Sequence, residues 1–246
     1  MIQVTQKQKE EAIAHFQYEG VLASEGPYGS GHINDTFLLT FDVEGEGKRN
    51  VILQRMNNEV FSDPVGLMEN IVGVTSYLRK KIIDDGGDPD RETLNVIPTV
   101  DGKDYYVDGA GDYWRSYKFI TDATSYDKVE KPEHFYQSAV AFGHFQCMLA
   151  DYPAETLHET IVGFHDTKAR FATFKKVVEE DVMGRAASVK KEIQFVLEHE
   201  DVANYFSDLL AKREIPLRVT HNDTKLNNIM ICLLYTSDAA DDLIGV

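Results

Sequence analysis

The segment HNDTKLNN, residues 221–228, carries side chains whose types and spacing fit phosphoryl transfer. His221, Asp223 and Asn228 stand in an H-x-D-x-x-x-x-N pattern, and Lys225 follows the aspartate by two residues. This chemistry requires a carboxylate that accepts the proton of the attacking hydroxyl, and oxygen ligands for a metal ion. We assign Asp223 the role of base, and we expect the amide oxygen of Asn228 to join the metal shell.

Two neighbouring residues are expected to support this pair. The Lys225 ammonium would offset negative charge on the transferring phosphoryl group. His221 is expected to brace the loop by hydrogen bonds and not to act on the substrate. The alternative is a polar surface turn, since asparagine and aspartate favour turns. The motif lies between two apolar segments that predict short strands, IPLRVT (215–220) and IMI (229–231), and this placement favours the functional interpretation.

A second candidate site is the glycine-bearing segment EGPYGSGHINDTF, residues 25–37. Gly29 and Gly31 precede a predicted strand, and the absence of a side chain lets backbone N–H groups approach phosphate closely. Ser30 and Asn34 would add side-chain donors or fix the turn. The segment matches neither the Walker A nor the Rossmann motif. The alternative is a plain glycine-rich hairpin.

The third feature is the predicted strand NVILQRM, residues 50–56. A kinase-type sheet places a basic residue on its third strand, where it contacts ATP phosphates and pairs with a helix glutamate. Gln54 and Arg55 compete for that place, and they point to opposite faces of the strand. Glu69, on a helix predicted over 63–83, is the candidate partner. Arg55 and Glu69 would otherwise be solvated surface residues.

Hydrophobic patterning divides the chain into a β-rich part and a helical part. The first 120 residues predict one helix, then about five antiparallel strands with a second helix inserted between them; these elements are helix 3–18, strands 37–43, 50–56, 96–100, 104–108 and 113–120, and helix 63–83. After Thr121 the pattern predicts helices over 132–150, 167–181 and 188–213. We therefore predict an α+β, protein-kinase-like two-lobed fold. Its β-rich N-lobe spans 1–121, and an incomplete, mainly helical C-lobe spans 122–231.

Composition excludes several kinds of partner. The 246 residues carry a net charge of −16, which argues against binding to a nucleic-acid phosphate backbone. A small anion such as ATP is not excluded, because a local site can be positive or can carry Mg²⁺. The two cysteines favour a reducing compartment, and the charged N-terminus does not resemble a signal peptide. Without an apolar run long enough to span a bilayer, we expect a cytoplasmic protein with no membrane partner.

The segments YGSGHINDTF, VILQRMN, LMENI, YWRSYKFI and RVTHNDTKLNN together resemble the aminoglycoside phosphotransferase and choline kinase superfamily. Within it, the sequence is most similar to bacterial N-acetylhexosamine 1-kinase-like proteins, over about residues 15–231. The resemblance implies a kinase-like fold, ATP and Mg²⁺ as cofactors, and transfer of the γ-phosphoryl group to a small-molecule hydroxyl. For the most similar relatives, that group is the anomeric hydroxyl of an amino sugar.

The resemblance also implies roles for residues of the β-rich part. The loop from Gly29 to Asn34 would lie over the nucleotide phosphates. Residues 117–121, which include Tyr117 and Phe119, would form the hinge that receives adenine. Gln54 stands about where many relatives carry lysine or arginine, which leaves the identity of the phosphate-binding cation open.

Three functions fit these observations. The first is a sugar 1-kinase, and the second is a kinase of another small alcohol, such as choline or an aminoglycoside. The third is a pseudokinase-like module that holds a nucleotide or a sugar without chemistry. The presence of both Asp223 and Asn228 counts against this third function, whose remaining support is Gln54.

The final segment CLLYTSDAADDLIGV, residues 232–246, resembles no part of this superfamily. It resembles the translation of a transposase-type sequencing adapter, so we expect a non-native tail after Ile231. The superfamily continues past the IMI strand with a second metal-binding aspartate and with helices that shape the acceptor pocket. We therefore expect the chain as written to be an inactive fragment of an active kinase.

Overall fold

The computed structural model describes residues 4–29, 33–232 and 236–237. The chain forms two compact units, the first made of residues 1–161 and 219–246 and the second of residues 162–218. The predicted lobe boundary at residue 121 lies inside the first unit. The first unit contains the loop 221–228 together with all the other predicted site residues that the structure describes.

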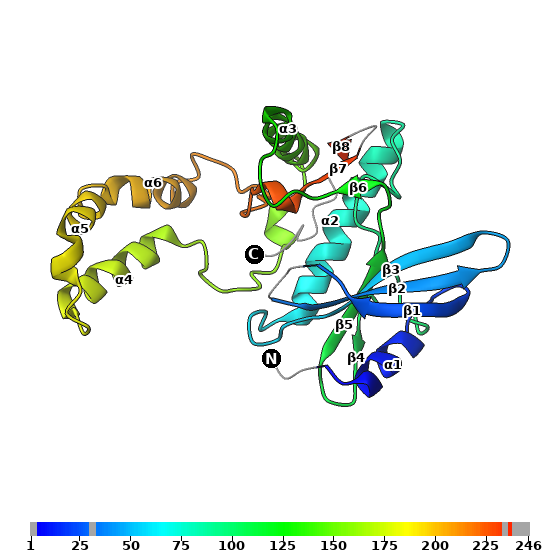
Figure 1. Ribbon diagram of the computed structural model, residues 1–246. Coiled ribbons are helices and arrows are strands. Elements are labelled where there is room, and N and C mark those ends of the chain that lie inside the picture. The colour runs from blue at the N-terminus through cyan, green and yellow to red at the C-terminus, as the bar shows by residue number, and fades with distance from the viewer. Residues whose placement is uncertain (1–3, 30–32, 233–235, 238–246) are drawn as a thin grey trace. The chain divides into compact units, whose positions relative to one another are not determined.

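An antiparallel sheet of five strands forms the base of the first unit, in the order β1-β2-β3-β5-β4 (Figure 1). The strands are β1 (Val21–Pro27), β2 (Asp35–Val43), β3 (Gly47–Arg55), β4 (Tyr106–Val107) and β5 (Tyr113–Lys118). The predicted hairpin of 37–43 and 50–56 is confirmed as β2 and β3. Its turn contains Gly45 and Gly47 at φ values of 78° and 89°, which glycine adopts without strain.

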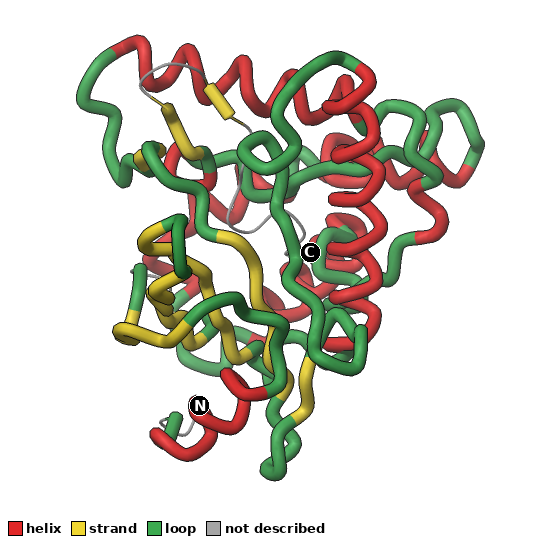
Figure 2. The backbone as a smooth tube through the Cα atoms, turned by 90° about the vertical axis from the view of Figure 1, so that its right-hand side faces the viewer, coloured by secondary structure: helices red, strands yellow, loops and turns green. Residues whose placement is uncertain are grey.

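The strand predicted over 96–100 is wrong. This segment makes only isolated bridges, from Val96 to Tyr117 and from Thr99 to Phe16. Pro98 lies between the two bridging residues and has no N–H group to donate to a ladder, so a continuous strand is not formed here. Figure 2 shows, in green, the loops that connect the helices and strands.

The two faces of the sheet are covered by different helices. Helix α1 (Gln6–Ala14) packs on one face, in a buried cluster that includes Leu53 of β3 and Trp114 of β5. Helix α2 (Pro64–Asp84) lies on the other side, in a cluster that includes Met56 and Tyr113. Because successive side chains alternate between faces, these contacts fix the direction of the other side chains on β3 and β5.

Helix α2 continues past the sheet and packs on α3 (Pro132–Met148). The predicted helices 63–83 and 132–150 are thereby confirmed. Asp63 caps α2 by accepting the backbone N–H of Gly66, and Pro64 occupies the first helical turn. The buried contact between the two helices is apolar, and it consists of Val74, Leu78, Ile82, Phe145, Met148 and Leu149. After α3, a short 3₁₀ turn follows at Ala154–Thr156.

The loop 221–228 leads into a strand of a small second sheet. The strands of this sheet are β6 (Ala123–Thr124), β7 (Met230–Cys232) and β8 (Thr236–Ser237), in that order. The predicted IMI strand is confirmed within β7, and a 3₁₀ turn at Leu226–Asn228 precedes it. The strand predicted over 215–220 is wrong, since this segment has no regular structure. Pro216 removes a donor there.

The second unit is helical, with α4 (Thr167–Glu180), a 3₁₀ turn (Ala186–Val189), α5 (Lys190–Leu197) and α6 (Glu200–Ala211). The predicted helix 167–181 is confirmed, but the predicted helix 188–213 is divided at residues 198–199. The His199 ring N–H donates to the Phe195 carbonyl at 2.6 Å. The His199 backbone N–H bonds instead to Val196, so the side chain has displaced a helical hydrogen bond. None of the described helices is long and apolar enough to cross a membrane.

Candidate functional site

The loop 221–228 is folded by a sharp turn at Asn222. This residue has a φ of 62°, in the left-handed region that asparagine tolerates better than most residues. The Thr220 hydroxyl donates to Asn222 Oδ1 at 2.7 Å. The turn reverses the chain between a buried His221 and a half-exposed Asp223.

His221 braces the loop, in the position that the sequence predicted. Its ring Nδ1 accepts the backbone N–H of Asp223 at 3.3 Å. Its edge packs against two aromatic rings of α3, Phe142 and Phe145, with ring centroids 5.1 and 5.8 Å away. The side chain is 5% exposed, so α3 and the loop enclose it. The geometry fits a residue that positions Asp223.

Asn228 holds the carboxylate of Asp223. Its side-chain N–H group donates to Asp223 Oδ2 at 2.8 Å and to the Asp223 carbonyl at 2.9 Å. Both partners are acceptors, so the amide nitrogen must face them, and the amide oxygen points elsewhere. Within the described residues, Asn228 Oδ1 receives no hydrogen bond. It is therefore an oxygen ligand that a hard cation such as Mg²⁺ can use.

The loop also suits the way in which magnesium binds. Mg²⁺ takes one or two protein oxygens and completes its shell with water and substrate phosphates. The part of the chain that the structure describes contains no group of three or more His, Cys, Asp and Glu side chains arranged to hold a metal ion. A magnesium ion at Asn228 would therefore depend on the phosphates of a bound nucleotide.

Lys225 contacts the same oxygen of the carboxylate as Asn228 does. Its Nζ lies 2.9 Å from Asp223 Oδ2, the oxygen that also accepts from Asn228. Partial burial raises the pKa of Asp223, but the hydrogen bonds from Lys225 and Asn228, and the Lys225 charge, outweigh it. The pKa of Asp223 therefore lies below its ordinary value. The carboxylate is ionised at neutral pH and can accept a proton.

The segment that follows β5 ties the loop to the rest of the unit. β6 pairs with β7 directly after the loop. The Ser125 hydroxyl donates to the Asn227 carbonyl at 2.6 Å, and the Asn227 amide donates to Asp127 at 3.3 Å. These contacts join segments about a hundred residues apart, and the sequence pattern gave no sign of Ser125 or Asp127.

The glycine-bearing loop lies between β1 and β2. Gly29 has a φ of 78°, which requires glycine or a strained substitute. Asn34 Oδ1 accepts the backbone N–H of Asn57 at 3.0 Å, so of its two expected roles the structure shows the fixing of a turn. Ser30 and Gly31 lie outside the described residues.

The expected hinge begins in β5. Tyr117 is buried, and Phe119 packs edge-on against Tyr28 beside the glycine-bearing loop, with centroids 5.6 Å apart. The Phe119 backbone N–H donates to the Asn50 carbonyl at 3.3 Å, so the hinge stays joined to β3. The start of the glycine-bearing loop, at Tyr28, therefore contacts the residue that directly follows β5.

The predicted contact between Arg55 and Glu69 is wrong. Arg55 is 4% exposed and forms ion pairs with Asp35 at 2.6 Å and with Asp112 at 2.9 Å. Glu69 pairs with His158 at 2.6 Å. The reason is the direction of the side chains: Arg55 points to the face that α1 covers, whereas Glu69 lies on α2. Gln54, the competing candidate, points toward the α2 face.

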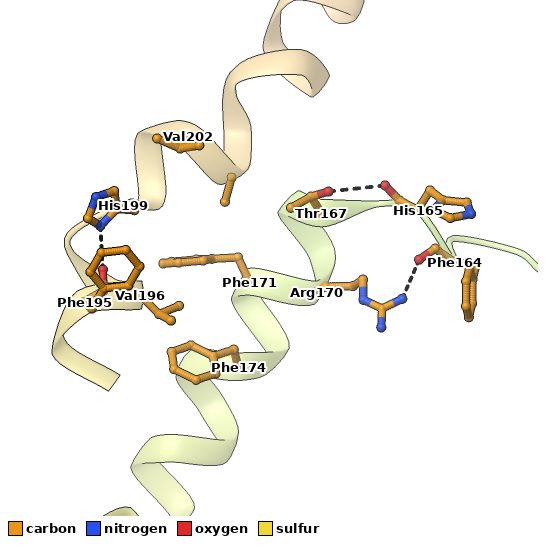
Figure 3. A pocket seen from close by; sticks show the side chains of 11 residues that line it. Phe164, His165, Thr167, Arg170, Phe171, Phe174, Phe195, Val196, His199 and Val202 are labelled. Carbon is orange, nitrogen blue, oxygen red and sulfur yellow. Dashed lines mark hydrogen bonds between the residues drawn. The ribbon is translucent and has the colours of Figure 1, made fainter. Parts of the chain in front are cut away.

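A pocket of about 540 Å³ lies within the second unit (Figure 3). Aromatic rings from α4 and α5 face each other across it, among them Phe171 and Phe195. Its full lining is Phe164, His165, Thr167, Arg170, Phe171, Phe174, Phe195, Val196, His199, Val202 and Ala203. This lining contains no carboxylate, so the pocket lacks a proton acceptor like that of the loop 221–228. The sequence signal for it was slight: Phe171 and Phe174 stand three residues apart in α4, and Phe195 lies in α5.

No protein-family model matches the chain, but two solved structures of phosphotransferases have a similar fold. One is the amicoumacin kinase hAmiN in complex with AMP-PNP, Ca²⁺ and Ami, with 13% identity and a TM-score of 0.58 over 98% of this chain and 64% of that one. Another is an aminoglycoside phosphotransferase from Alicyclobacillus acidocaldarius, with 12% identity and a TM-score of 0.52 over 99% of this chain and 66% of that one. The chain thus spans just under two thirds of the length of each. The predicted kinase-like α+β fold is confirmed.

Proposed function

We propose that this protein transfers the γ-phosphoryl group of ATP to a hydroxyl group of a small molecule. The observation that carries the proposal is the arrangement of Asp223, Asn228 and Lys225, in which one oxygen of an ionised carboxylate is bound by both an amide and an ammonium group. The fold supports it, because the same fold occurs in a kinase solved with AMP-PNP and Ca²⁺.

In this mechanism Asp223 is the catalytic base. It accepts the proton of the acceptor hydroxyl while that oxygen forms a bond to the γ-phosphorus and the bond to the bridging β–γ oxygen breaks. Asn228 fixes the carboxylate and offers its amide oxygen to the metal. Lys225, which pairs with Asp223, would offset charge on the transferring group. Mg²⁺, when bound, would neutralise charge on the phosphate oxygens.

The finer proposal concerns the acceptor. The sequence resemblance supports an amino sugar, phosphorylated at the anomeric hydroxyl of an N-acetylhexosamine. Another small alcohol, such as choline or an aminoglycoside, is the alternative. The test is a panel of these acceptors with ATP and the full-length gene product, with the phosphorylated position read by NMR. Turnover confined to choline or aminoglycosides would overturn the amino-sugar assignment.

The substitution Asp223→Asn distinguishes an active kinase from a pseudokinase-like module that binds a nucleotide without chemistry. We expect this substitution to lower kcat by about 10²- to 10⁴-fold, the usual contribution of a positioned base. The Kd for ATP should stay within about twofold, since the substitution retains the shape of the side chain. The measurement is steady-state turnover of the full-length protein together with calorimetric titration of ATP.

Asp101→Asn is a matched control for this experiment. Asp101 also pairs with a lysine two residues later, at 3.0 Å, but it lies in an exposed turn far along the chain from the loop 221–228. We expect normal turnover in this variant. Unchanged turnover in Asp223→Asn would refute the assignment of the base.

A further inference from the structure

The face of the sheet toward α2 carries a buried arginine that sequence reasoning did not single out. Arg115 lies directly opposite Gln54 in the antiparallel register of β3 and β5. Residues opposite each other share a face, so Arg115 points to the α2 side, as Tyr113 does. Tyr117, two residues further along β5, shares this face and begins the expected hinge.

Arg115 is held in place without a carboxylate. Its Nε donates to Gln54 Oε1 at 2.8 Å, and Gln54 in turn donates to the Thr36 hydroxyl at 2.9 Å. The guanidinium lies 6.0 Å from the centre of the Tyr117 ring. The side chain is 7% exposed, and no Asp or Glu among the described residues forms an ion pair with it.

The contrast with Arg55 is informative. Both arginines are buried, but Arg55 has two aspartates as partners. A buried charge is costly unless a counter-charge compensates it. Arg115 therefore has the properties of a cation whose counter-charge comes from a bound anion. Gln54 occupies Nε, which leaves the two terminal nitrogens to bind two oxygens of one phosphate group.

We propose that Arg115 binds the phosphate oxygens of the nucleotide and that Gln54 orients it. This inference rests on the proposed function. It moves the phosphate-binding cation from β3 to the neighbouring strand β5, and it accounts for a glutamine at the position where a lysine or arginine was expected. Gln54 acts as a positioning residue, through its hydrogen bond to Arg115.

The test is calorimetric titration of MgATP and of adenosine into the 246-residue chain and its variants. We expect Arg115→Gln to weaken MgATP binding by about 10- to 100-fold, the effect of losing a charge-assisted hydrogen bond, while adenosine binding is unchanged. Arg49→Gln is the control, because Arg49 lies on the same sheet but is exposed and pairs with Glu19 and Glu46. This control should bind MgATP normally.

The exchange variant Gln54→Arg/Arg115→Gln keeps the test valid if Arg115→Gln unfolds. It returns the cation to β3 within the same cross-strand pair, and we expect it to bind MgATP more tightly than Arg115→Gln, or to retain affinity where the single variant cannot be purified. If the wild-type chain binds MgATP and a folded Arg115→Gln binds it equally well, the inference is overturned while the proposed kinase function stands. If the wild-type chain binds MgATP no more tightly than adenosine, the inference is overturned as well, whereas the proposed kinase function is tested separately by turnover of the full-length protein.

Discussion

At the scale of single residues, the chemistry of Asp223 depends on the two side chains that touch one of its oxygens. Asn228 and Lys225 both bond to Oδ2, which leaves Oδ1 for the proton of a substrate. These two contacts lower the pKa of Asp223 against the opposing effect of burial. A base with a low pKa stays active in moderately acidic solution.

Lys225→Met should therefore change the pH dependence of catalysis. Removal of the Lys225 hydrogen bond and charge raises the pKa of Asp223, because both of these interactions lower it. The acid limb of the profile of kcat/KM against pH should move to higher pH, and turnover should fall at every pH. The measurement is that profile for the full-length protein. Lys103→Met, which removes the lysine paired with Asp101, should leave the profile in place; a shift equal to that of Lys225→Met would contradict the assignment.

At the scale of elements, the turn between β4 and β5 is organised by Asp108. Its carboxylate accepts from the Trp114 indole N–H at 2.9 Å and from the backbone N–H groups of Ala110 and Asp112. Trp114 is fully buried among the side chains that join α1 to the sheet. One carboxylate thus aligns the strand that carries Trp114 on one face and Arg115 on the other.

Asp108→Ala should lower the free energy of unfolding by about 3 kcal/mol, because it leaves the indole N–H and two backbone donors without their acceptor. Urea denaturation measures this change. Asp101→Ala, in an exposed turn, should cost less than about 1 kcal/mol. Equal losses in the two variants would show that the Asp108 contacts do not contribute as expected.

Asp108 should also contribute to acid sensitivity. Burial raises its pKa, but the hydrogen bonds from Trp114 and the backbone outweigh burial and lower it below the ordinary value. A carboxylate with a lowered pKa stabilises the folded state above its unfolded pKa of about 4, and the contribution is lost as the pH falls through the folded pKa. The wild-type chain should therefore lose more stability than Asp108→Asn as the pH falls below about 4, the ordinary pKa of an aspartate. Urea denaturation of both proteins at neutral pH and at decreasing pH measures the difference.

At the scale of the whole molecule, the second unit is joined to the first by segments without regular structure. Residues 214–220 contain neither helix nor strand, and Leu217 is 57% exposed. Exposed loops of this kind are the preferred sites of proteolysis. Trypsin can cleave after Arg218, which lies in this segment, and after Lys212 and Arg213, which directly precede it.

Brief digestion with trypsin should therefore cut first at one of these three residues. The expected products are an N-terminal piece that holds the five-stranded sheet and α4 to α6, and a C-terminal piece that holds the loop 221–228. Mass spectrometry of the first fragments checks the site. An earlier cut within β3 or α2 would contradict the division into two compact units.

Local patterns determined much of this architecture. The hairpin of β2 and β3 follows from two apolar runs around a glycine turn, and helices α2, α3 and α4 follow from apolar residues at helical spacing. The sequence pattern failed at residues that disrupt backbone hydrogen bonding. His199 interrupts a helix in this way, and Pro98 and Pro216 stop strands that their apolar neighbours predicted.

The sequence by itself determined the residue types of the loop 221–228 and their spacing, because a base, an amide ligand and a cation within eight residues are a local property. Only the tertiary structure decided to which face of the five-stranded sheet each buried arginine points. Arg55 and Arg115 are sixty residues apart in the chain, and their directions depend on the register of β3 with β5 and on which helix covers each face. Such pairing joins distant segments, so its result is a property of the folded sheet.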